Sequence, residues 1–169
     1  MASLGKDALD ASRRPASGML MGRLSALMFM QFFVWGAWNV TLGLVMQTVG
    51  IGSLIANAFS VGPIASIAGS FLLGMAATRY LSPRALMVAL HLVGGAILLA
   101  MPLLVTPETG GTFVWLLLGY MILYMPTVGL ANTIALKSFG ERADRFPFVR
   151  AFGTLGWIVA GLIIGWMGL

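Results

Sequence analysis

Five long apolar segments alternate with short polar linkers along most of the chain. They occupy residues 24–47, 53–77, 85–105, 112–136 and 148–169. Each reaches the roughly 20 residues that a helix needs to cross about 30 Å of hydrocarbon. A helix satisfies its own backbone hydrogen bonds, which water cannot do inside a bilayer. The pattern therefore predicts a bundle of about five transmembrane helices over 23–169, after a flexible tail over 1–22.

The composition supports a membrane protein and narrows its chemistry. Of 169 residues, 59% are hydrophobic and 9% are charged, and the mean hydropathy is +0.96. A water-soluble globule of this size needs more polar surface, so we expect an all-α integral membrane protein. The chain contains no cysteine, which excludes disulfides, thiolate metal ligands and cysteine nucleophiles.

The basic residues alternate between linkers and predict the orientation in the membrane. The net charge is +5, and the Lys and Arg residues outside the apolar segments lie before the first segment, up to Arg23, and in the linkers 78–84 and 137–147. The linkers 49–52 and 106–111 contain neither residue. Short basic loops stay cytoplasmic, so we expect the amino terminus inside and the carboxyl terminus outside. The cations form no basic patch on a soluble domain, and we expect no nucleic-acid partner.

No carboxylate lies within an apolar segment. All five acidic residues fall in the tail or the linkers: Asp7, Asp10, Glu108, Glu141 and Asp144. His91 is therefore a weak candidate for proton coupling, and a neutral imidazole bonded to a neighbouring helix is the simpler explanation. The segments also lack paired carboxylates, a Ser/His/Asp set and a cluster of metal ligands. We expect no enzyme activity, no metal and no cofactor.

Small residues recur at every fourth position of the segment 53–77, namely Ala58, Gly62, Ser66, Ser70 and Gly74. This spacing lets two helices approach closely in lipid, so the pattern predicts a packing seam. It also leaves open a second kind of function, in which a small membrane interaction protein binds another helix through this seam.

Two segments contain polar and aromatic residues suited to a binding cavity. Gln31, Trp35 and Trp38 follow the spacing i, i+4, i+7 and share one helix face. Such a face is either a packing surface or the wall of a cavity where a flat ligand stacks. In 112–136, Asn132 lies near Pro126, which is expected to bend the helix and free hydrogen-bonding groups.

Arg150, Thr154 and Trp157 repeat this spacing in the last segment. They place a guanidinium, a hydroxyl and an indole along roughly 10 Å of one helix face. The set complements a ligand with oxygen atoms at one end and a flat ring at the other. Alternatively, Arg150 extends its side chain to the cytoplasmic headgroups.

Four stretches are the basis of a family resemblance: "LMFMQFFVWGAWNVTLG", "GMAATRYLSPRALMVALHLVGGAILL", "YMPTVGLANTIAL" and "FPFVRAFGTLGWIVAG". Together they resemble the amino-terminal half of a nucleoside:proton symporter of the major facilitator superfamily, from Leu24 to the last residue. The resemblance implies nucleoside binding by Arg150, Thr154 and Trp157, where the family more often has Phe at the last position. Thr78 stands where the superfamily has an acidic residue in the loop between the second and third spans, which puts the usual gating contact in doubt.

The resemblance also implies the wider setting. The family has twelve spans in two six-helix bundles, so the five predicted helices correspond to an incomplete amino-terminal bundle without its carboxyl-terminal partner. The expected function is proton-coupled nucleoside uptake by alternating access, with nucleoside, proton and the lipid bilayer as partners. The expected location is a bacterial inner membrane. Gln31, Trp35 and Asn132 are weaker candidates for substrate binding, and a transporter of another small polar solute, such as a sugar, is the alternative.

Overall fold

The computed structural model describes the backbone of residues 18–76 and 82–168, and the side chains of 18–71 and 82–168. Every regular element in these ranges is helical, as the hydropathy pattern predicts. The elements are α2 (Gly18–Asn39), α3 (Leu42–Thr48), η1 (Gly52–Leu54), α4 (Ile55–Ala76), α5 (Pro83–Ala100), η2 (Met101–Leu104), α6 (Gly110–Phe139), η3 (Gly140–Arg145) and α7 (Phe146–Trp166). The α2 helix begins at Gly18, inside the stretch expected as tail, and residues 1–17 lie outside the described ranges.

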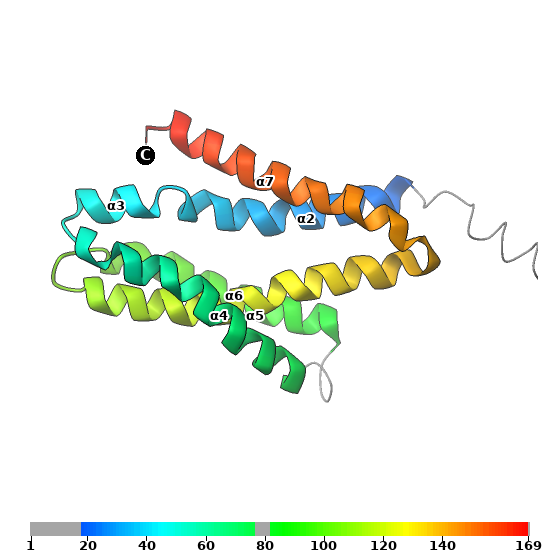
Figure 1. Cartoon of the computed structure of the whole chain (residues 1–169), viewed down its shortest axis with the longest axis horizontal. Helices are drawn as coiled ribbons and strands as arrows, with labels where there is room; N and C mark the ends of the chain where they lie inside the picture. The colour runs from blue at the N-terminus through cyan, green and yellow to red at the C-terminus, as the bar shows by residue number, and fades with distance from the viewer. Residues whose placement is uncertain (1–17, 77–81, 169) are drawn as a thin grey trace, which may run out of the picture.

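The described helices are long and apolar enough to cross a membrane, and the protein is an integral membrane protein. Four stretches meet this criterion: 18–48, 52–71, 83–104 and 110–166. The last contains both α6 and α7, which are antiparallel and joined by η3 (Figure 1). Gly140 turns the chain there with a φ of 57°, a conformation that glycine adopts without a Cβ penalty. The structure thus separates the fourth and fifth apolar segments at the predicted linker.

The first apolar segment is not one continuous helix. The α2 helix ends at Asn39, and α3 begins at Leu42. The β-branched residues Val40 and Thr41 lie between the two, and the Val40 amide is 3.5 Å from the Gly36 carbonyl oxygen. Restricted side-chain rotamers lower the helix propensity of such residues.

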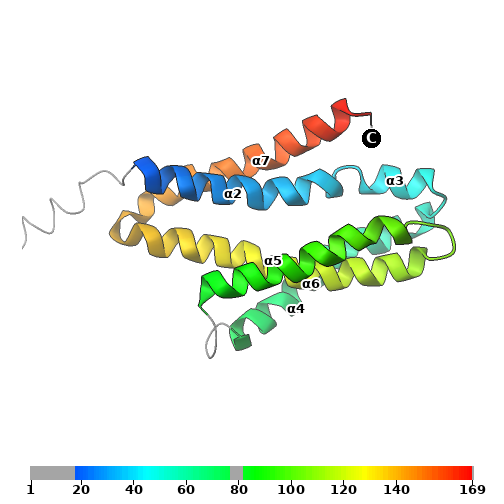
Figure 2. The same ribbon diagram turned by 180° about the vertical axis from the view of Figure 1, so that it is seen from behind.

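The helices pack in a definite order. Figures 1 and 2 show α2 lying along α7, and α6 contacts α4, α5 and α2. Cap interactions and prolines fix several starts. The Ser82 hydroxyl accepts a hydrogen bond from the Ala85 amide at the start of α5, for example, and α7 has Pro147 in its first turn.

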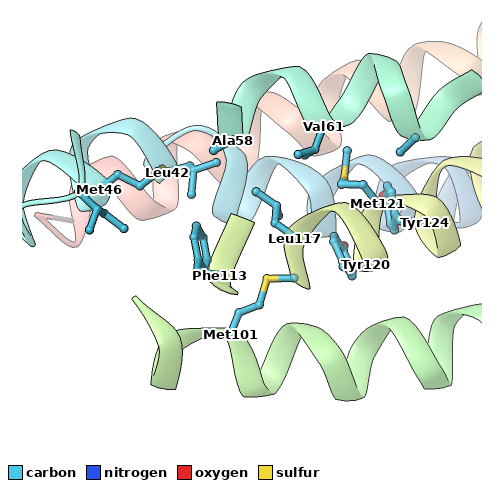
Figure 3. Packing of buried hydrophobic residues seen from close by; sticks show 12 residues of the cluster. Leu42, Met46, Ala58, Val61, Met101, Phe113, Leu117, Tyr120, Met121 and Tyr124 are labelled. Atoms are coloured by element: carbon cyan, nitrogen blue, oxygen red, sulfur yellow. The ribbon is translucent and has the colours of Figure 1, made fainter. Parts of the chain in front are cut away.

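The main core lies around the amino-terminal half of α6. Its buried side chains include Leu117, Tyr120, Met121 and Tyr124, and Figure 3 shows them on α6 between α4 and α5. A second cluster packs α2 on the opposite half of α6, through residues such as Leu24, Met28 and Ala135. The two clusters hold α2 against α6 on both sides of the middle of the bundle.

The packing stripe of α4 differs from the predicted seam. Ala58, Val61, Ala65 and Gly69 are buried, whereas Ser66 and Ser70 are exposed. Each serine hydroxyl donates a hydrogen bond within α4, to Gly62 at 2.9 Å and to Ser66 at 2.7 Å. Small residues at every fourth position drift around a helix of 3.6 residues per turn, so the contact stripe takes steps of three and four. Within this chain the predicted packing is confirmed at Ala58, and Gly62 is half-buried with room for a Cβ 3.6 Å from Met121 Cε. Ser66 and Ser70 lie on an exposed face, and Gly74 lies outside the described side chains.

Glycines let α2 and α7 approach to backbone contact. A Cβ on Gly36 would lie 3.1 Å from both the Trp157 carbonyl oxygen and the Ala160 Cβ. A Cβ on Gly156 would fall onto the Phe29 carbonyl. This close approach places the side chains that flank the contact on the two helices directly beside one another.

Candidate functional site

The Arg150 guanidinium lies over an aromatic ring of the neighbouring helix. Its Cζ is 4.1 Å from the centroid of Phe32 on α2, and the Arg150 side chain is half-buried. A guanidinium above a ring face is attracted by the quadrupole of the ring, more strongly where water is scarce. Gly153 leaves room for this contact, because a Cβ there would lie 2.7 Å from Phe32 Cδ2 and 2.8 Å from Arg150 Nη1.

Two indoles meet one turn further along the same pair of helices. The ring centroids of Trp35 and Trp157 are 5.0 Å apart, with an interplanar angle of 84°. Trp35 also contacts Tyr124 of α6 edge-on, at 6.2 Å. Both indoles are half-buried. Arg150 and Trp157 are therefore both on the side of α7 next to aromatic residues of α2.

Thr154, the third residue of the predicted set, is exposed. It lies one turn from Arg150 on the flank of α7. The buried stripe of α7 consists of Val149, Gly153, Gly156 and Ala160. At about 100° per residue, Arg150, Thr154 and Trp157 lie roughly a quarter-turn or more to one side of that stripe. The structure thus brings the guanidinium, hydroxyl and indole together along one edge of the α2–α7 contact.

A pocket of about 320 Å³ lies beside Trp35, between α2, α4 and α6. It is lined by Trp35, Trp38 and Asn39 of α2, by α4, and by Met121 and Met125 of α6. The Trp35 Nε1 atom is buried and has no hydrogen-bond partner among the described residues. A buried N–H donor without a partner is costly, and it gives this part of the site a free donor for an oxygen acceptor.

Asn132 is on the same side of α6 as Met125. The two residues are seven positions apart, which places Asn132 about 10 Å towards the η3 end of the helix. Asn132 is half-buried, and its Oδ1 has no hydrogen-bond partner among the described residues. Its carboxamide oxygen is therefore a free acceptor on α6, between the pocket and the η3 end of that helix.

Gln31 and His91 are placed apart from this edge. Gln31 is 3% exposed and its Nε2 donates a hydrogen bond of 2.7 Å to Thr127 Oγ1. His91 of α5 lines a groove of about 710 Å³ between α2 and α5, and its Nδ1 lies 2.9 Å from the Met87 carbonyl oxygen of its own helix. Gln31 therefore contributes to the α2–α6 contact, and His91 lies on the α5 side of α2.

The paired charges and the acidic and histidine side chains in the described part of the chain do not form a second candidate site. The ion pair seen there joins Asp144 and Arg145, at 3.5 Å on the surface of η3. Within the described ranges, no three His, Asp or Glu side chains approach closely enough to hold a metal ion. Thr78, where the superfamily has an acidic residue, lies outside the described residues.

Sequence reasoning missed Phe32, which provides the ring beneath Arg150. The spacing on α7 identifies the residues that share a face, but not the side chain of another helix that meets them. One signal was available: Gly153, Gly156 and Ala160 form a stripe of small residues on α7, which predicts a close helix contact beside Arg150.

Comparison with known proteins gives consistent matches over nearly the whole chain. The profile of the nucleoside H+ symporter family matches residues 19–168. The chain is 35% identical over 146 residues to YegT and 34% identical over 152 residues to the nucleoside permease NupG, both of Escherichia coli K12, covering 86% of this chain in each case. A crystal structure of the nucleoside transporter NupG superimposes with a TM-score of 0.80 at 32% identity, over 88% of this chain and 38% of that one. The chain spans about a third of the length of these two relatives.

Proposed function

Because the chain belongs to the nucleoside H+ symporter family, we propose that it takes part in proton-coupled uptake of nucleosides. Arg150, Thr154 and Trp157 of α7, together with Trp35 of α2, form the solute-binding face of this bundle. The observation that supports this assignment is the placement of Arg150, whose guanidinium lies 4.1 Å from the Phe32 ring. That contact turns the cation towards α2, where the Phe32 ring lies 6.2 Å from the ring of Trp35.

The chemistry of this edge suits a nucleoside. An indole offers a flat apolar surface on which a base can stack. A guanidinium donates to carbonyl or hydroxyl oxygens in a fixed planar geometry, and Thr154 can donate or accept one further bond. Asn132 and the Trp35 N–H are free polar groups nearby. Ring stacking and oxygen recognition are thus available within two helix turns.

The proposed orientation follows from the basic residues. Arg23, Arg84 and the basic residues of η3 lie at one end of the helices, and the described loop at the other end contains Glu108. We place the end with the arginines in the cytoplasm of a bacterial cell, with the protein in the inner membrane. Arg150 would then lie at the cytoplasmic side of the bound solute.

Alternating access supplies the transport step in this proposal. A second bundle would form the opposite wall of the solute site, and rocking of the two bundles would expose the site to either side in turn. The role of this chain is to present the α2–α7 edge to the solute. His91 remains a weak candidate for proton coupling, because its ring nitrogen contacts a carbonyl of its own helix.

The test compares Arg150→Ala with Arg145→Ala in cells that express the protein from its complete reading frame. Arg145 is exposed and lies five positions earlier at the same end of α7. We expect uptake of labelled uridine in the wild type and in Arg145→Ala, and at least a tenfold loss in Arg150→Ala. Equal uptake in both variants would reject the site assignment.

Competition separates the proposed substrate from the alternative class. Unlabelled nucleosides should suppress uridine uptake, and a hundredfold excess of a sugar should not. Suppression of uptake by the sugar and not by nucleosides would instead support a sugar transporter. Failure to transport any solute, together with specific capture of a helix partner, would support the interaction-protein alternative.

A further inference from the structure

A closed loop of hydrogen bonds joins α2 to α6 in the middle of the bundle. Gln31 Nε2 donates to Thr127 Oγ1 at 2.7 Å, and Thr127 Oγ1 donates to the Tyr124 carbonyl oxygen at 2.6 Å. The Tyr124 hydroxyl donates to the Gln31 carbonyl oxygen. Gln31 is 3% exposed, Thr127 1% and Tyr124 4%. These groups are shielded from water, so breaking one bond leaves a partner unsatisfied.

The direction of each bond in this loop is determined by chemistry. A threonine hydroxyl has one proton, and Thr127 gives it to the Tyr124 carbonyl. Its lone pairs therefore face Gln31, which must donate with its amide N–H₂. The Tyr124 hydroxyl likewise uses its single proton on the Gln31 carbonyl. The three residues thus specify one relative position of α2 and α6, because a shift of one residue along either helix breaks two bonds.

Three of the other hydroxyls on the described parts of the helices bond within their own helix. Thr133 of α6 donates to the Gly129 carbonyl of its own helix at 2.9 Å, and Ser66 and Ser70 also bond within α4. Thr127 differs because its oxygen accepts a hydrogen bond from another helix.

The α2 residues that flank Gln31 are those that meet the proposed binding residues of α7. Phe32 follows Gln31 directly and lies beneath Arg150. Trp35 is one turn later and contacts both Trp157 and Tyr124. Tyr124 therefore both closes the hydrogen-bonded loop and touches the indole that faces α7. A change in the α2–α6 register would move both aromatic contacts of the binding edge.

We propose that Gln31, Thr127 and Tyr124 are positioning residues for the solute site. They fix the register of α2 against α6 and thereby set where Phe32 and Trp35 meet Arg150 and Trp157. This inference rests on the proposed function for its transport consequence. Its structural part, the control of the Trp35–Trp157 geometry, is independent of any solute.

The experiment uses three threonine variants. Thr127→Val removes the hydroxyl while keeping the branched shape, Thr127→Ser restores the hydroxyl, and Thr133→Val is the matched control on the same helix. Near-ultraviolet circular dichroism of the purified protein without solute reports the geometry of the indole pair. Uridine uptake at varied concentration gives KM and the maximal rate.

We expect Thr127→Val to change the near-ultraviolet spectrum and to raise KM about fivefold, the effect of losing one buried hydrogen bond between two helices. The maximal rate per folded molecule should change less than KM. Thr127→Ser should recover both properties, and Thr133→Val should resemble the wild type. The spectral change should disappear when Thr127→Val is made in a Trp157→Phe background, because the indole pair is then absent.

The outcomes separate the two proposals. If Thr127→Val matches Thr133→Val in spectrum and KM, the positioning role is wrong, whatever the wild type transports. If the wild type takes up no nucleoside while the spectrum changes as expected, the proposed function fails and the positioning of the indole pair stands. If Thr127→Val does not fold, Tyr124→Phe provides the test, since it removes only the bond to the Gln31 carbonyl. If the part of the spectrum that depends on Trp157, measured against the Trp157→Phe background, is the same with and without Tyr124→Phe, the inference is overturned.

Discussion

Trp35 and Trp157 meet edge to face across the α2–α7 contact, with their ring centroids 5.0 Å apart and their planes at 84°. This geometry places the positive edge of one indole against the negative face of the other. A base that stacks on Trp157 must share or displace this contact. The strength of solute binding therefore depends on the indole at 157 and on its distance from α2.

The ring at position 157 should be required for affinity, and its exact size should matter less. Trp157→Phe keeps a stacking surface, and we expect uridine KM within about threefold of the wild type. Trp157→Ala removes an aromatic contact of about 1 kcal/mol, which corresponds to a roughly fivefold higher KM. Trp166→Ala is the control, because Trp166 is 90% exposed at the end of α7. Equal KM values for Trp157→Ala and Trp166→Ala would contradict the stacking role.

Substitution at the closest helix contact should destabilise the bundle. Gly156→Ala places a methyl group on the Phe29 carbonyl, and forcing the backbones apart should cost about 1–3 kcal/mol. In Gly165→Ala the new Cβ has nothing within 4 Å, so we expect little change. Thermal unfolding in detergent measures both. A Gly156→Ala protein as stable as Gly165→Ala would show that α2 and α7 are less closely packed than described.

The α4–α6 contact should depend on the buried stripe and not on the serines. A Cβ on Gly69 would lie 2.8 Å from the Pro126 ring, so Gly69→Ala should lower the midpoint of thermal unfolding. Ser66→Ala removes only a hydrogen bond within α4 and should shift the midpoint much less. The reverse order of the two midpoints would restore the seam predicted from the every-fourth-residue spacing.

Replacement of His91 should leave the pH dependence of transport intact. Its Nδ1 contacts the Met87 carbonyl, and its ring meets Tyr124 edge-on at 6.1 Å, so its contacts are those of a packing residue. We expect His91→Gln, which keeps a donor for that carbonyl, to show the same profile of uridine uptake between about pH 5 and 8, where histidine titrates. A loss of proton dependence with uptake retained would assign the coupling role to His91.

Helix existence was predictable because the hydrophobic segments match the thickness of a bilayer. The common edge of Arg150, Thr154 and Trp157 was also predictable, since residues at i, i+4 and i+7 share a side of any α-helix. These inferences use one helix at a time, and they were accurate for that reason.

Contacts between helices were less predictable. Gln31, Phe32 and Trp35 lie within about one turn of α2. Phe32 and Trp35 nevertheless contact α7, whereas the Gln31 side chain bonds to α6. The side chains of these residues point in directions that differ by only a fraction of a turn. The sequence of α2 does not reveal which helix lies on each side. The spacing on α4 likewise does not reveal which small residues pack within this chain, and the Ser66 and Ser70 hydroxyls bond to their own helix on an exposed face.

The glycines of α2 and α7 have a consequence for motion. With Gly36 and Gly156 against the backbone of the neighbouring helix and Gly153 against the Phe32 ring, α2 and α7 have little space to slide far past one another. The two helices should therefore travel together through a conformational cycle, and only small shifts, such as those that the α2–α6 hydrogen bonds control, would alter how Trp35 and Trp157 meet. Any difference in solute affinity between inward-open and outward-open states would then originate mainly in the facing wall.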